Sequence, residues 1–270
     1  MVNYKYDNAL HNAAAICDVE ALRRCLTPEA LAACPINTRD RDDHTALHAL
    51  CRYEGPRRDD DLYDNLRRAD NRNAEDVEVC VQLLVDAGAD LEAHEENGWS
   101  PLHAVAWSSG DLGTEATSRL TSLLLRHGAK VDNRDNTVYS TLLHAAAAHG
   151  PSSMVSLLLK AGAAVNVLTE GYPPARPLDM ALLFTRRTTL PILLRAGGVL
   201  NRYLRRGPDV GRLDQDCADY LAKVDAGGGF KKYEQAHLAT LTKTFTPKFP
   251  MLPPEMVRHI LTFGFHAGFY

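Results

Sequence analysis

Three histidines recur in the same local setting along the chain, and a repeated set of histidines could bind a metal ion. His48, His103 and His144 each follow a leucine and precede an alanine. A metal site needs ligands that converge on one point. These histidines instead occupy the same position in successive sequence repeats, so they are expected to lie one after another along the molecule and not to meet at one point. We therefore expect each imidazole to hydrogen-bond the backbone near its own hairpin, and we predict no metal site.

No other group of residues has the spacing of a catalytic or cofactor site. The six cysteines form no Cys-x-x-Cys pair. The glycine run at 227–229 lacks the apolar strand that precedes a phosphate loop, so a linker is the better interpretation. The acids at 59–61 follow two arginines, which is typical of a solvated charge run. The nucleophile-elbow, Walker and zinc-protease motifs are absent. We predict no catalytic residue, no cofactor and no enzymatic activity.

The elements that position these residues are internal repeats. The clearest copy spans residues 140–165, and another spans 97–129. In each copy, alanines after the Leu-His pair let two helices approach closely. Paired leucines then mark the buried stripe of a second helix, and a glycine follows as its C-cap. The pattern predicts stacked helix pairs that bury Leu84, Leu124, Leu158 and Leu193 between them.

These residues resemble the ankyrin repeat, whose pattern is Thr-Pro-Leu-His-x-Ala followed by Leu-Leu-x-x-Gly-Ala. About five copies can be placed, at 10–22, 40–89, 97–129, 140–165 and 176–198. The first lacks its Gly-Ala closure, as expected of a terminal capping repeat. The resemblance implies an all-α ankyrin-repeat solenoid, with helix-turn-helix repeats joined by hairpin loops, that binds another protein through its concave face.

The repeats account for residues 1–200, and residues 201–270 are predicted to form a C-terminal helical cap. Helices are expected at 213–224 and 230–245. The second repeat carries a polar insert at 54–73, between its two helices. A solvated loop is the favoured interpretation of this insert. A protruding contact element is the alternative, since long inserts in compact arrays are often functional.

Composition narrows the class of partner. The chain has 270 residues, 45% of them hydrophobic and 24% charged, with a net charge of −4, which argues against a general nucleic-acid binder. No window reaches the apolar length of a membrane span, and the start lacks an apolar signal region. Several cysteines fall in helix-core slots, as reduced cysteines do in the cytosol. We expect a cytoplasmic or nuclear protein whose partner is neither nucleic acid nor membrane.

The resemblance also implies which residues face the partner. In the family, the positions after the alanines of the first helix point toward the concave groove. Here they include Arg52, Tyr53, Trp107, His149 and Phe184, the last four forming a predicted column of rings. The adjacent hairpins supply acids, which predict a partner with an apolar centre and basic flanks. The alternative is that Trp107 and Phe184 pack inward. The acids are Asp40, Asp42, Asp43, Glu95, Glu96 and Asp135.

The C-terminal run from Leu252 to Leu261 resembles the opening of an F-box, which begins Leu-Pro-x-Glu and continues to an Ile-Leu pair. In that family the stretch docks onto a Skp1-type adaptor of a cullin ubiquitin ligase. The resemblance would place Leu252, Pro253, Glu255 and Ile260 at that contact. The segment is well under half the length of an F-box. The alternative is an amphipathic helix that buries Met256, Val257, Ile260 and Leu261 against the array.

Overall fold

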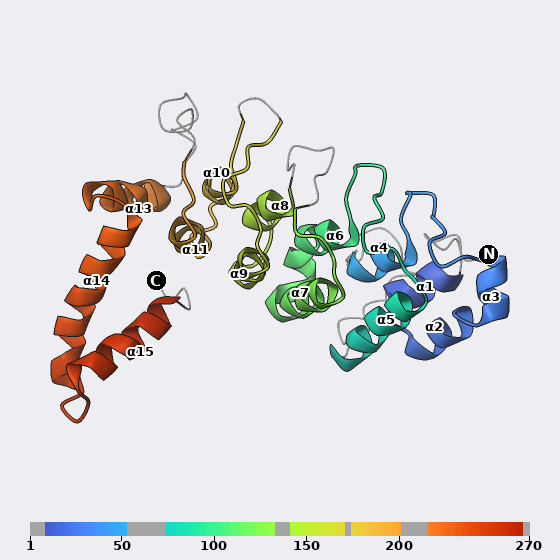
Figure 1. Cartoon of the computed structure of the whole chain (residues 1–270), viewed down its shortest axis with the longest axis horizontal. Helices are drawn as coiled ribbons and strands as arrows, with labels where there is room; N and C mark the ends of the chain where they lie inside the picture. The colour runs from blue at the N-terminus through green and yellow to red at the C-terminus, as the bar shows by residue number, and fades with distance from the viewer. Residues whose placement is uncertain (1–8, 53–73, 133–140, 171–173, 201–214, 267–270) are drawn as a thin grey trace, which may run out of the picture. The chain divides into compact units, whose positions relative to one another are not determined.

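The computed structural model describes residues 9–52, 74–132, 141–170, 174–200 and 215–266. Every regular element within these ranges is a helix, which confirms the predicted all-α fold (Figure 1). The chain forms two compact units, residues 1–164 and 165–270. The predicted boundary near residue 200 rests on where the repeat pattern stops, and it remains a prediction. No helix of the described residues is long and apolar enough to cross a membrane.

The first unit is built from two rows of helices, in which each helix packs against the next of its row. The loops at 34–45 and 87–100 rise from the same side of these rows (Figure 1). The first row is α1 (Ala9–Ala15), α4 (Ala46–Cys51), α6 (Pro101–Trp107) and α8 (Leu142–Ala148). The second row is α2 (Val19–Cys25), α5 (Ala74–Asp86), α7 (Ser109–Arg126) and α9 (Ser152–Lys160).

The two rows differ in the side chains that they bury. First-row helices are short and alanine-rich, and every residue of α4 and α8 is buried. Small side chains let these helices pack closely without leaving voids. Second-row helices contribute leucines, of which Leu84, Leu124 and Leu158 are fully buried, as is Leu193 in the second unit. The predicted burial of these four leucines is confirmed.

Glycines end the second-row helices, as the repeat pattern predicts. Gly88, Gly128 and Gly162 have φ angles of 86°, 97° and 98°. The residue after each glycine donates its N–H to a carbonyl of the helix's last turn, as in the 2.9 Å bond from Ala89 to Leu84. A left-handed residue at this position satisfies carbonyls that would otherwise lack a donor. The chain can then turn toward the next hairpin.

The N-terminal repeat departs from this plan. In place of a glycine closure it has a short helix, α3 (Pro28–Ala33), which begins after the cap residue Thr27. The Thr27 Oγ1 atom accepts the Ala30 N–H at 3.3 Å. No residue of α3 is buried. This confirms the expectation of a degenerate capping repeat that turns one side to water.

Two repeats are longer than the standard period. In the second, α4 ends at Cys51 and α5 begins at Ala74, so the predicted insert at 54–73 lies outside the described residues. In the third, the extra residues form a helical turn at the start of α7. Gly113, with φ 76° and ψ 162°, separates this turn from the rest of the helix. The rest of α7 therefore keeps its place between α5 and α9.

The second unit begins with the fifth helix pair, α10 (Pro177–Leu183) and α11 (Leu190–Arg195), which pack against each other. The following helices are α13 (Gln215–Ala226) and α14 (Phe230–Phe245), then a 3₁₀ turn at Thr246–Lys248, then α15 (Pro254–His266). They confirm the helices predicted at 213–224 and 230–245. Arg195 Nε donates to Glu234 Oε1 at 2.9 Å, which joins α11 to α14.

Helix α15 starts where the Pro-Pro-Glu run predicts, but it buries fewer side chains than expected. Val257 is buried and Leu261 is half-buried, whereas Met256 and Ile260 are 53% and 54% exposed. The expectation that all four are covered is therefore wrong for Met256 and Ile260. α15 packs against α14, and a single neighbouring helix covers only a narrow stripe of its surface.

Candidate functional site

The recurrent histidine of the second repeat joins that repeat to the next hairpin. His48 Nδ1 lies 2.9 Å from Thr45 Oγ1, and it also accepts the Thr45 backbone N–H at 3.3 Å. His48 Nε2 lies 2.9 Å from the carbonyl oxygen of Trp99. Since Nδ1 accepts, Nε2 must carry the proton that it donates to this carbonyl. Burial lowers the pKa of His48 to about 3, so the ring stays neutral at physiological pH.

Other repeats use the same contact between the histidine Nδ1 atom and the hydroxyl of the cap residue. The cap hydroxyl of Ser100 lies 2.9 Å from His103 Nδ1, and that of Thr141 lies 2.7 Å from His144 Nδ1. In the first repeat His11 Nε2 donates to the His44 carbonyl at 2.9 Å. The predicted structural role of these histidines is confirmed. No three histidine, cysteine, aspartate or glutamate side chains meet at a possible metal site in the part of the chain that is described.

Three rings form an aromatic patch on the first unit, made of Trp99, Trp107 and His149. Trp99 precedes α6, Trp107 ends α6, and His149 follows α8. The centroids of Trp99 and Trp107 are 4.9 Å apart, and those of Trp107 and His149 are 4.7 Å apart. The structure places Trp107 at the surface, 45% exposed. Aromatic side chains of this kind carry much of the binding energy at protein interfaces.

The backbone beneath the aromatic patch is held at two points. The Trp99 carbonyl accepts the bond from His48, and the His149 carbonyl accepts the Ser109 hydroxyl at 2.6 Å. Both bonds run between residues of different repeats. The rings are therefore positioned before any partner arrives, which reduces the entropy lost on binding.

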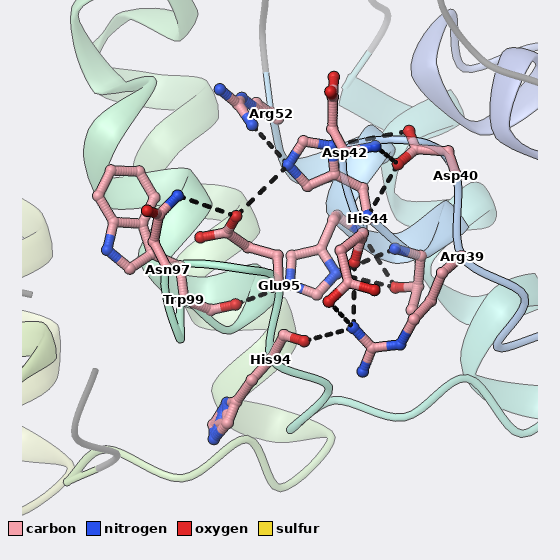
Figure 2. Close-up of polar contacts among 12 residues, drawn as sticks. Arg39, Asp40, Asp42, His44, Arg52, His94, Glu95, Asn97 and Trp99 are labelled. Carbon is pink, nitrogen blue, oxygen red and sulfur yellow. Dashed lines mark hydrogen bonds and ion pairs between the residues drawn. The ribbon is translucent and has the colours of Figure 1, made fainter. Parts of the chain in front are cut away.

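The acids of the hairpins are arranged differently from the predicted rim. Asp40 Oδ1 accepts the backbone N–H groups of Asp42 and His44, at 3.0 and 2.8 Å. The side chains of Asp40 and Glu95 are only 1% and 5% exposed and lie beside His44 (Figure 2). Their placement on an exposed rim is wrong, because Asp40 caps backbone donors of its own turn and Glu95 packs between hairpins.

The remaining rim residues lie nearer the surface. Asp42 and Glu96 are exposed. Asp43 is half-exposed, with φ 64°, and it binds Arg39 at 2.7 Å. Arg52 is half-buried and donates from Nη1 to His44 Nε2 at 2.5 Å (Figure 2). Its guanidinium therefore contacts the hairpin beside it.

The structure joins only part of the predicted aromatic column. Trp107 and His149 are in contact, as the column requires. Tyr53 and Asp135 lie outside the described residues. Phe184 is 40% exposed and belongs to the second unit, so its place in the column remains a prediction. Trp99 was not among the predicted contact residues. Its signal was its place directly after the turn glycine Gly98, eight residues before the other tryptophan.

The predicted adaptor contact lies at the start of α15. Leu252 is half-buried, while Pro253, Glu255 and Ile260 are exposed. Met256 adds to the exposed apolar surface of Ile260, so α15 carries an uncovered apolar stripe among its described residues, and the exposed Met251 lies just before the helix. An apolar stripe of this kind is typical of a helix that binds a groove.

Comparison with known proteins locates the repeats independently. Residues 69–197 match the family model described as ankyrin repeats (3 copies). A stretch of 126 residues is 31% identical to delta-latroinsectotoxin-Lt1a from Latrodectus tredecimguttatus, covering 47% of this chain and 10% of the toxin. The chain thus spans a small part of that protein's length. Residues 252–261 lie outside the family match, so their resemblance to an F-box remains a prediction.

Proposed function

Because the fold is an all-α ankyrin-repeat solenoid, and ankyrin repeats are protein–protein interaction modules, we propose that this chain is a scaffold that binds a partner protein. We place the contact on the face that is concave in the family, with the aromatic patch at its centre. The observation that carries the proposal is the surface position of Trp107 between Trp99 and His149. The step from fold to function is an analogy, and the patch makes it specific.

We further propose that the bound segment has an apolar centre and basic flanks. The apolar centre follows from the rings of the aromatic patch. The basic flanks follow from the exposed carboxylates of Asp42 and Glu96 on the second and third hairpins. Since Asp40 and Glu95 face inward, this attraction comes from fewer acids than the hairpin sequence alone suggests. It therefore contributes more to the rate and specificity of association than to affinity.

The proposal is tested by comparing partners captured by the full chain and by Trp107→Ala. Binding to a recombinant captured partner should weaken by at least about 1–2 kcal/mol in this variant, with its unfolding transition nearly unchanged. Ile16→Ala is a matched control, since Ile16 is an exposed apolar residue of the same unit away from the patch. A variant that loses stability but binds normally when folded would show that Trp107 belongs to the core.

A second function is favoured by the exposed stripe of α15. Met256 and Ile260 lie one turn apart on the helix and are not covered. This arrangement supports the alternative that the protein is a substrate adaptor, with α15 docking a Skp1-type subunit of a cullin ubiquitin ligase. Such a role would place the chain in the cytoplasm or nucleus, where the buried cysteines Cys51 and Cys80 would also stay reduced.

The adaptor proposal is tested with purified Skp1 and the full chain. Met256→Glu combined with Ile260→Glu should abolish binding and leave the helical signal intact, because both side chains are exposed. Arg258→Ala on the same helix is the matched control and should bind normally. Absence of binding by the unaltered chain would leave α15 as a cap of the unit only.

A further inference from the structure

The thiols of Cys17 and Cys80 lie in contact between the first two repeats. Cys17 is in the turn that joins α1 to α2, and Cys80 is on α5, which packs against α2. Their side chains share a hydrogen bond. Cys17 is 7% exposed and Cys80 is fully buried, and both residues are present as thiols. Two sulfur atoms from distant parts of the sequence thus meet in the core.

The backbone at Cys17 gives a second and independent reason to assign this pair a role. Cys17 has a φ angle of 56°, in the left-handed region that favours glycine. The turn that requires this angle closes α1, because the Asp18 N–H bonds the Ala13 carbonyl at 3.0 Å. Glycines fill the corresponding position at the ends of the second-row helices. A side chain is therefore unfavourable here, and the contact of its sulfur with Cys80 is something that glycine could not supply.

We propose that Cys17 and Cys80 form a reversible disulfide that ties the first repeat to the second. A disulfide holds its two sulfur atoms about 2.05 Å apart. Thiols that are already in hydrogen-bond contact reach this distance by a small movement of their side chains. In a reducing compartment the pair stays as thiols, and hydrogen peroxide is the oxidant that converts it.

The reaction consists of two steps that balance in atoms and electrons. Peroxide oxidises the sulfur of Cys17, the more exposed of the two, to a sulfenic acid, and its O–O bond breaks with release of one water. The Cys80 sulfur then attacks the Cys17 sulfur. The S–S bond forms, the S–O bond breaks, and the hydroxyl leaves with the Cys80 proton as a second water. One peroxide is reduced as two thiols are oxidised, and a dithiol reductant reverses the change.

The pair becomes accessible when the terminal repeat opens. The hydrogen bond to Cys17 and then burial raise the pKa of Cys80, so little thiolate is present at neutral pH and the closed fold reacts slowly. A repeat at the end of an array contacts one neighbour and can open while the other repeats stay folded. Oxidation captures the pair as the repeat closes again. The bond then opposes further opening, because it constrains the open state.

The test treats the full chain with hydrogen peroxide, alkylates the remaining thiols and maps the peptides by mass spectrometry. A peptide pair that joins Cys17 to Cys80 should appear, lighter by two hydrogen atoms than the separate thiols, and dithiothreitol should remove it. Amide hydrogen exchange in α1 and α2 should slow by at least about tenfold in the linked chain. Exchange in α9, two repeats away, should stay unchanged.

Variants separate the pair from the other cysteines. Cys17→Gly suits the left-handed backbone and should fold, and Cys80→Ala removes the second sulfur. Neither variant should show slower exchange after peroxide. Cys217→Ala, which alters a buried cysteine of the second unit, is the matched control and should link normally.

Three results would overturn the proposal. The first is a Cys17 that remains unlinked after peroxide treatment of the full chain. The second is a Cys17 that pairs with Cys25 or Cys34, which lie at the ends of α2 and α3. The third is a linked chain whose α1 amides exchange as fast as those of the reduced chain, because the bond would then not tie the two repeats together.

Discussion

At the scale of single residues, the imidazole of His48 joins two repeats, and its Nδ1 atom accepts a bond that only the neutral ring can accept. The ring accepts from Thr45 and donates to the Trp99 carbonyl. Its pKa of about 3 compares with an ordinary histidine pKa of 6.5. Between these two values the unfolded chain binds more protons than the folded chain. Acid therefore favours the unfolded state.

We predict that the free energy of unfolding falls by up to about 1.4 kcal/mol for each pH unit between pH 6.5 and about 3 because of His48 alone. His48→Gln should be less stable at pH 7.5 and should lose this share of the pH dependence. Urea denaturation at pH 7.5, 6.0 and 5.0 measures both effects. His259→Gln, which alters an exposed histidine of α15, is the control. Parallel pH slopes in wild type and His48→Gln would contradict the prediction.

At the scale of elements, the second repeat keeps its helix pair despite the long segment between its two members. α4 and α5 contact each other, and each also packs against its own row. These contacts join the two helices through residues that the structure describes. Loop-closure entropy grows slowly with loop length.

Replacement of residues 54–73 by a Gly-Ser linker of the same length should leave the thermal transition nearly unchanged. A shorter linker should be neutral or slightly stabilising for the same entropic reason. Circular dichroism at 222 nm during heating is the measurement. If the same-length replacement collapsed the helical signal, the insert would be shown to pack on the core.

Some elements were predictable from the sequence, because their signals are local. The glycine run and the prolines determine the limits of α14, and the recurrent Leu-Leu-Gly pattern determines the second row. The inward turn of Glu95 was not predictable, because it depends on the distance between two hairpins. Likewise, the exposure of Ile260 depends on how many helices surround α15. Periodicity marks the apolar face of a helix and says nothing of what covers it.

At the scale of the whole molecule, stability in a repeat array is a sum over neighbouring units. The second-row leucines illustrate this, since Leu158 on α9 is fully buried where α9 packs against α7. Truncation of Leu158 would leave a cavity and remove contacts from two repeats together. Truncation of a side chain at an exposed position of α9 would remove almost none.

Leu158→Ala should lower the free energy of unfolding by about 2–5 kcal/mol, the usual cost of truncating a core leucine. Lys160→Ala, at the exposed end of the same helix, should cost less than about 0.5 kcal/mol. Chemical denaturation gives both values, and hydrogen exchange should quicken in α7 as well as in α9. A loss as small for Leu158→Ala as for Lys160→Ala would refute its place in the core.

Trp99 divides two tasks between different atoms of one residue. Its carbonyl oxygen receives the bond from His48, while its indole lies against Trp107. Every amino acid carries the same carbonyl, so the bond between repeats is indifferent to the side chain at this position. Residues that meet a partner can thus be exchanged in evolution or in design without loosening the stack. Binding of a partner and packing of the repeats therefore depend on different atoms of the same stretch of chain.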